Sequence, residues 1–218
     1  NYELGLKGTV LDRMVTFDVA LYQVDWKDIQ LQNTALPSQF VFFTNGKKAR
    51  SRGIESQVTV RPWTGMTIDA NATIGKSELT RTLSRSTANQ QVLTGTAGDR
   101  LPYSTRFTGN LSVQQEIPLS SDLTGRVGFN VNHVGNRFGD FNLDSPAARY
   151  GRAKLPAYTL VDLTAGLTVA KRFEFNLYVR NLFDKRTPLI VDTGNGVRLP
   201  QAIFSTPRIA GINMSVQY

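Results

Sequence analysis

Apolar and polar residues alternate with a period of two along most of this chain. The clearest case is residues 173–180, FEFNLYVR, in which every second residue is apolar. The same alternation recurs over residues 15–22, 68–75, 107–113, 127–132, 161–169 and 210–218. Because successive side chains of a β-strand point to opposite faces, each segment predicts a strand with one apolar and one polar face. The chain is therefore predicted to be all-β.

The length of the strands and of their connections favours a membrane barrel over a soluble sandwich. Alternation persists for about ten residues in several segments, whereas soluble strands are usually nearer five or six. The predicted turns are short at residues 11–13, 63–65, 119–122 and 170–172. Longer polar stretches separate them at about residues 32–39, 80–100, 138–155 and 188–205. Short turns that alternate with long loops are typical of an antiparallel up-and-down outer-membrane β-barrel.

Residues 1–218 predict about nine strands of such a barrel, with Tyr218 at the periplasmic end of the last strand. An open sheet of this size would leave two unpaired strand edges in lipid, which is costly because lipid offers no hydrogen-bond partners. We therefore expect a partial barrel, namely the C-terminal portion of a longer one.

Composition excludes several other classes of protein. The chain has no Cys and one His, so disulfide scaffolds, thiolate zinc sites and histidine relays lack the residues that they need. The net charge is +8, but the basic residues are spread along the chain and no nucleic-acid-binding motif accompanies them. No group of residues has the spacing of a catalytic site, and we expect no enzyme activity, no cofactor and no metal site.

Several segments resemble the TonB-dependent receptor family in sequence and in order. Residues 178–186, YVRNLFDKR, resemble its NLFDK motif, here Asn181, Leu182, Phe183, Asp184 and Lys185. Residues 45–55, NGKKARSRGIE, resemble an upstream strand of the family, and residues 20–30 resemble the strand before it. Shorter matches occur at residues 99–102 and 155–158, so the resemblance covers nearly all of the chain.

The resemblance implies a barrel of about 22 strands in the bacterial outer membrane, surrounded by lipid and lipopolysaccharide. It implies import of a ferric siderophore or a similarly scarce nutrient, energised by the TonB complex. A plug domain and a TonB box, both expected to be absent from residues 1–218, would complete the receptor. Tyr218 resembles the C-terminal aromatic signal that the barrel-assembly machinery recognises.

Ligand contacts are expected in the long loops, because loops on a rigid scaffold commonly carry binding residues. The candidates are Arg81, Arg85, Arg100, Arg149, Tyr150 and Arg152. Arginine recognises anionic oxygen groups and tyrosine stacks on planar ligands, although ordinary solvated loop residues would give the same sequence.

Two other functions stay open at this point. A passive porin-like channel would have no plug and would conduct without an energy source. A β-sheet binding module at the cell surface would fold in water without lipid.

Overall fold

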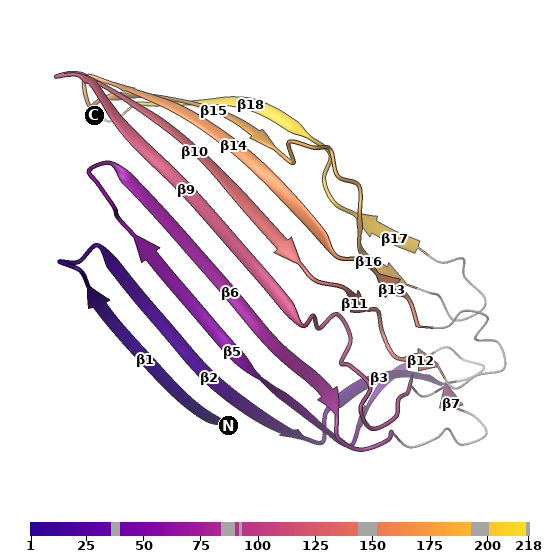
Figure 1. Ribbon diagram of the computed structural model, residues 1–218. Coiled ribbons are helices and arrows are strands. Elements are labelled where there is room, and N and C mark those ends of the chain that lie inside the picture. The colour runs from indigo at the N-terminus through magenta and orange to yellow at the C-terminus, as the bar shows by residue number, and fades with distance from the viewer. Residues whose placement is uncertain (36–39, 84–89, 92, 144–151, 193–200, 217–218) are drawn as a thin grey trace.

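The computed structural model describes residues 1–35, 40–83, 90–91, 93–143, 152–192 and 201–216, which form one broad sheet with short strands gathered at one end (Figure 1). The nine long strands are β1 (Tyr2–Val10), β2 (Val15–Lys27), β5 (Lys48–Val60), β6 (Met66–Leu79), β9 (Phe107–Ser120), β10 (Leu123–Val134), β14 (Tyr158–Val169), β15 (Phe173–Arg180) and β18 (Ile209–Val216). Within the described residues, no helix has the length and apolar character needed to cross a membrane.

Each long strand is hydrogen bonded antiparallel to the next long strand along the chain. The order in the sheet is β1-β2-β5-β6-β9-β10-β14-β15-β18, so the chain runs up and down without a crossover. This confirms the predicted nine-stranded, up-and-down part of a barrel. Strands β1 and β18 lie at the two ends of the sheet.

The apolar face of the sheet is exposed. Leu4 in β1 is 72% exposed, Ile74 in β6 is 59% exposed and Ile212 in β18 is 67% exposed. A soluble sheet would cover such a face with a second layer. In a membrane barrel the same face contacts lipid, so the apolar residues of the predicted alternation face outward.

The short connections lie together at one end of the sheet, which we call the turn end (Figure 1). Leu11, Asp12 and Arg13 join β1 to β2 with φ values of 54°, 52° and 68°. Gly65, with a φ of 82°, joins β5 to β6, and a Cβ atom there would collide with the carbonyl oxygen of Glu116. All four predicted short turns are at this end.

The long connections lie at the opposite end, which we call the loop end, and they contain short strands that the sequence did not predict. One small sheet consists of three strands, β3 (Gln30–Ala35), β4 (Val41–Asn45) and β7 (Gln90–Gln91). Three two-stranded sheets pair β8 (Leu93–Thr94) with β12 (Asn142–Leu143), β11 (Arg137–Phe138) with β13 (Lys154–Leu155), and β16 (Pro188–Asp192) with β17 (Gln201–Phe204). The buried core also lies here, and its members are Ile29, Ala49, Leu79, Leu83 and Phe141. The loops therefore have secondary structure of their own, packed over a small hydrophobic cluster.

The connection between β15 and β18 is closed at its base by Asn181. Its side-chain amide donates to the carbonyl oxygens of Lys185 at 3.1 Å and Thr206 at 2.8 Å, and its oxygen accepts from the Lys185 backbone N–H at 2.9 Å. Its own backbone N–H donates to the Asp162 carboxylate at 2.8 Å. Asn181 is 3% exposed and has a φ of 50°, a conformation that asparagine tolerates better than most residues. The side chain of Asn181 thus joins the two ends of the loop, and its backbone N–H connects them to β14.

Two further side chains complete this closure. The Asp184 carboxylate accepts from the backbone N–H of Arg208 at 2.8 Å, and this hydrogen bond is the largest cause that lowers the pKa of Asp184 from its usual value. The Ser205 hydroxyl donates to the Lys185 carbonyl at 2.7 Å and accepts from the Thr187 backbone N–H at 3.1 Å. The motif 181–185 is therefore placed to hold the loop shut.

We predict that Asn181→Ala lowers the apparent free energy of unfolding of the whole receptor by about 3 kcal/mol, because buried backbone groups lose their partners. Denaturant titration of the receptor in detergent measures this change. Phe183→Ala is the control, since Phe183 is 72% exposed and its loss should cost less than about 0.5 kcal/mol. Equal effects of the two substitutions would contradict the role assigned to Asn181.

We also predict a pH dependence for Asp184. Its folded-state pKa is lowered, so the ionised carboxylate stabilises the fold above its unfolded-state pKa of about 3.9. This stabilisation is lost as the pH falls through the folded-state pKa. The difference in stability between the parent protein and Asp184→Asn should be constant above about pH 5 and shrink below about pH 4. Denaturant titrations from pH 3 to pH 7 test this, and a difference that does not change with pH would refute it.

Candidate functional site

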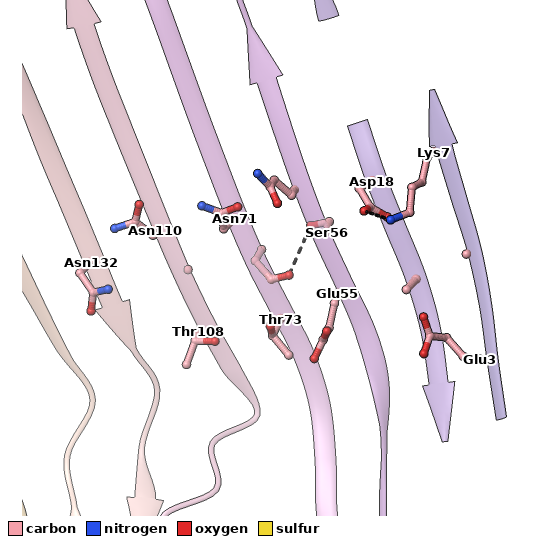
Figure 2. Close-up of a pocket in the computed structure, with 15 residues that line it drawn as sticks. Glu3, Lys7, Asp18, Glu55, Ser56, Asn71, Thr73, Thr108, Asn110 and Asn132 are labelled. Carbon is pink, nitrogen blue, oxygen red and sulfur yellow. Dashed lines mark hydrogen bonds and ion pairs between the residues drawn. The ribbon is translucent and has the colours of Figure 1, made fainter. Parts of the chain in front are cut away.

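The polar face of the sheet forms a hollow of about 460 Å³ across β1, β2, β5, β6, β9 and β10. Glu3, Lys7, Asp18, Glu55, Ser56, Gln57, Asn71, Thr73, Thr108, Asn110 and Asn132 contribute polar side chains to its lining (Figure 2). The period of two places most of these residues on one face, opposite the lipid-facing residues. We call this surface the polar wall.

Two pairs of side chains are joined on this face, one within the polar wall and one at its border on β10. Lys7 in β1 and Asp18 in β2 are register partners, and their side chains form an ion pair of 2.8 Å (Figure 2). Asn110 and Asn130 exchange two side-chain hydrogen bonds of 3.1 and 3.2 Å. Pairs of this kind satisfy charges and amides on a face that borders water or a polar partner.

A second polar network lies farther along the same face. The Arg126 guanidinium donates to the Glu174 carboxylate at 2.6 Å and to the Asn176 side-chain oxygen at 2.7 Å. It lies over Gly166, where the missing side chain leaves room for it. The polar face therefore continues across β10, β14 and β15.

Arg100 lies at the loop end, above the polar wall, and stacks on an aromatic ring. Its guanidinium carbon is 5.4 Å from the centre of the Phe138 ring. It donates to the backbone and side-chain oxygens of Asn136 at 2.8 and 3.0 Å. Partial burial is the largest cause that lowers the pKa of Arg100, although an arginine keeps its charge.

Arg152 stacks on the same ring as Arg100. Its guanidinium carbon is 5.2 Å from the centre of the Phe138 ring and 4.7 Å from that of Phe141, and its Nε donates to the Gly139 carbonyl at 3.0 Å. Burial is the main cause that lowers its pKa, and the nearby charge of Arg100 acts in the same direction. The structure thus brings together two of the six predicted ligand contacts.

Arg137 is a third arginine in this region, and the sequence analysis missed it. It is 7% exposed, its guanidinium carbon lies 5.2 Å from the centre of the Tyr158 ring, and Nη2 donates to the Leu189 carbonyl at 2.9 Å. Among the described residues, neither Nη1 of Arg137 nor Nη2 of Arg152 has a hydrogen-bond partner, although both atoms are buried. The sequence signal was weak, because Arg137 lies just before the predicted long loop at residues 138–155 and not within it.

We call Arg100, Arg137, Phe138 and Arg152 the arginine rim. Arg81 is exposed and is not a member of it. Arg85, Arg149, Tyr150 and Tyr218 lie outside the described residues. The motif residues Asn181 to Lys185 are not members of it either, and they lie at the base of the loop between β15 and β18.

The arginine rim has the chemistry of an anion site. Guanidinium groups whose N–H donors have no partner within the described chain favour carboxylate or other anionic oxygens, and the aromatic rings favour a planar ligand. In the described part of the chain, no group of three or more His, Asp or Glu side chains could hold a metal ion.

Comparison with known proteins identifies the wider family. Residues 1–182 match the family described as TonB dependent receptor-like, beta-barrel. The chain is 28% identical over 187 residues to the pesticin receptor of Yersinia pestis, covering 85% of this chain and 24% of that protein. It is 29% identical over 185 residues to the metal-pseudopaline receptor CntO of Pseudomonas aeruginosa, covering 85% and 23%. The chain therefore spans about a quarter of the length of these relatives.

Solved structures show the same fold. The ferric yersiniabactin uptake receptor FyuA of Yersinia pestis superimposes with a TM-score of 0.76 at 24% identity, covering all of this chain and 29% of that one. The ferric-catecholate import receptor Fiu of E. coli K12 gives a TM-score of 0.70 at 21% identity, covering 99% and 27%. Barrels of this kind lie in the bacterial outer membrane, with the turn end in the periplasm and the loop end outside the cell. The sheet, its alternating faces and the family match agree, and the chain belongs to the TonB-dependent receptor-like β-barrel family.

Proposed function

We propose that this chain forms part of the wall and outer loops of a receptor that imports a ferric siderophore or a similarly scarce nutrient, energised through TonB. The single observation that supports a ligand at these loops is the arginine rim at the extracellular end, where two guanidinium nitrogens have no hydrogen-bond partner among the described residues. Members of the family are transport receptors, which supports a role without enzyme activity. The names of the relatives, which include a ferric yersiniabactin uptake receptor, point to a metal chelate as the cargo.

The proposed ligand class follows from the chemistry of the rim. Ferric chelates present anionic oxygens around the iron, and guanidinium groups bind such oxygens through charge-assisted hydrogen bonds. Phe138 holds Arg100 and Arg152 on one ring, so part of the cost of ordering these long side chains is met before the ligand binds. The polar wall beneath the rim can border a hydrated path for a polar ligand.

The remaining partners are proposals of the same kind. The TonB complex would act through a plug and TonB box outside residues 1–218. Lipid and lipopolysaccharide would surround the apolar face, and the barrel-assembly machinery would recognise the C-terminal end at Tyr218.

We expect uptake of iron-55 bound to yersiniabactin, pyoverdine or a catecholate to require both the receptor that contains this chain and TonB. Cells that lack their other receptors, grown under iron limitation, provide the assay, with a proton uncoupler and a TonB deletion as controls. Uptake should stop in both controls, because import against a gradient needs energy. Uptake that persists in both, together with ion conductance in planar bilayers, would instead indicate a passive channel.

We expect Arg152→Gln to weaken binding of the transported chelate at least tenfold, because a hydrogen bond to a charged group contributes about 1.5–3 kcal/mol. Arg81→Gln removes the same charge from an exposed loop residue outside the rim and should change affinity less than about twofold. Fluorescence quenching of the purified receptor measures both affinities. Equal losses in the two variants would mean that net charge, rather than the rim, attracts the ligand.

A further inference from the structure

Near the extracellular end of β5 and β6, the outward face changes from apolar to charged and the inward face becomes apolar. Along most of each strand the outward side chains are apolar, and the last of these are Ile54, 43% exposed, and Ile74, 59% exposed. Beyond this row, the outward positions hold charged residues such as Arg52. The inward positions become apolar, with Ala49 and Leu79 only 2% and 1% exposed in the loop-end core. A sheet face that changes from apolar to charged marks the boundary of the hydrocarbon layer.

The outward charges above this boundary are mostly basic. They are Lys27, Lys48, Arg50, Arg52 and Lys76, with the acids Asp25 and Glu78, and we call them the outer basic belt. The strand register places them in adjacent rows: Gln23, Arg52 and Lys76 are partners across β2, β5 and β6, as are Asp25, Arg50 and Glu78. Lys27 and Lys48 form the next row. Five cations thus face outward beside two carboxylates.

The acids neutralise only part of this charge. Arg50 pairs with Asp25 at 2.6 Å, and Lys76 pairs with Glu78 at 2.5 Å. Within the described chain, no ion pair involves Arg52, Lys48 or Lys27. The belt therefore has a net positive charge that its own side chains do not compensate.

The height of the belt suits one class of partner. Arg52 and Lys76 each lie two residues beyond the last apolar row, which is about 7 Å along a strand. Phosphate groups at a membrane surface lie directly above the acyl chains, and clusters of basic residues beside them are attracted to anionic lipid. In the outer leaflet of the outer membrane, the phosphates next to the acyl chains belong to the lipid A part of lipopolysaccharide.

We infer that the outer basic belt binds the phosphate groups of lipid A, chiefly through Arg52 and Lys76. This inference deepens the proposal that lipopolysaccharide surrounds the barrel, and it rests on that proposal. A guanidinium can bind a phosphate with two parallel hydrogen bonds, and the ammonium of Lys76 adds a point charge. The apolar row of Leu21, Ile54 and Ile74 below them contacts the acyl chains of the same lipid.

The test uses the whole receptor, purified in detergent, freed of lipopolysaccharide and titrated with bisphosphorylated lipid A while native mass spectrometry records occupancy. We expect the double variant Arg52→Gln, Lys76→Gln to bind lipid A about 30-fold more weakly, since each basic residue near an anionic lipid surface contributes about fivefold. The charge-preserving pair Arg52→Lys, Lys76→Arg should stay within a few-fold of the parent. The matched control Arg13→Gln, Lys171→Gln removes two exposed cations from the periplasmic turns and should bind as the parent does.

Two results would overturn the inference: unchanged lipid A affinity in the Arg52→Gln, Lys76→Gln variant, or equal binding of lipid A without its phosphates. Affinity for ferric yersiniabactin is measured on the same samples. Loss of lipid A binding in the Arg52→Gln, Lys76→Gln variant, with the chelate affinity unchanged, supports binding of lipid A by the outer basic belt. Failure of every preparation to bind a ferric chelate would count against the proposed import function and leave the lipid result intact.

Discussion

The structure depends on one requirement, which is that every backbone N–H and C=O group inside the hydrocarbon layer must have a hydrogen-bond partner within the protein. A sequential antiparallel sheet meets this requirement between neighbouring long strands from β1 to β18. The same geometry sends alternate side chains to lipid and to the interior. The polar wall, the exposed apolar face and the separation of turns from loops all follow from it.

The sheet was predictable because its signal is local. In β14 and β15 the alternation alone defines both the strand and its outward face, and the short turn at residues 170–172 follows from where the alternation stops. The strands within the loops were not predictable in the same way. The pairing of β7 with β3, for example, has two residue pairs and joins segments that lie far apart in sequence, and a strand of two residues has no periodicity that could indicate it.

The candidate site, like the fold, could be predicted from the sequence only in part. Arg100 and Arg152 could be proposed from their residue type and their place in long loops. That both stack on Phe138 depends on a fold that brings residues 100, 138 and 152 together. Arg137 is buried against Tyr158, and burial at that point is a property of the assembled loops. The resemblance of residues 181–185 to a family motif suggested importance, and the structure explains it as closure of a loop.

The exchange of faces on β5 and β6 also has a mechanical consequence. If the sheet sank toward the periplasm by one row, Arg52 and Lys76 would enter the hydrocarbon layer. A basic residue on the lipid face costs up to about 2–4 kcal/mol at the midplane and less near the surface, so the free energy rises steadily with displacement. If the sheet rose by one row, Ile54 and Ile74 would enter water. The membrane therefore fixes the height of this part of the barrel wall, because movement in either direction raises the free energy.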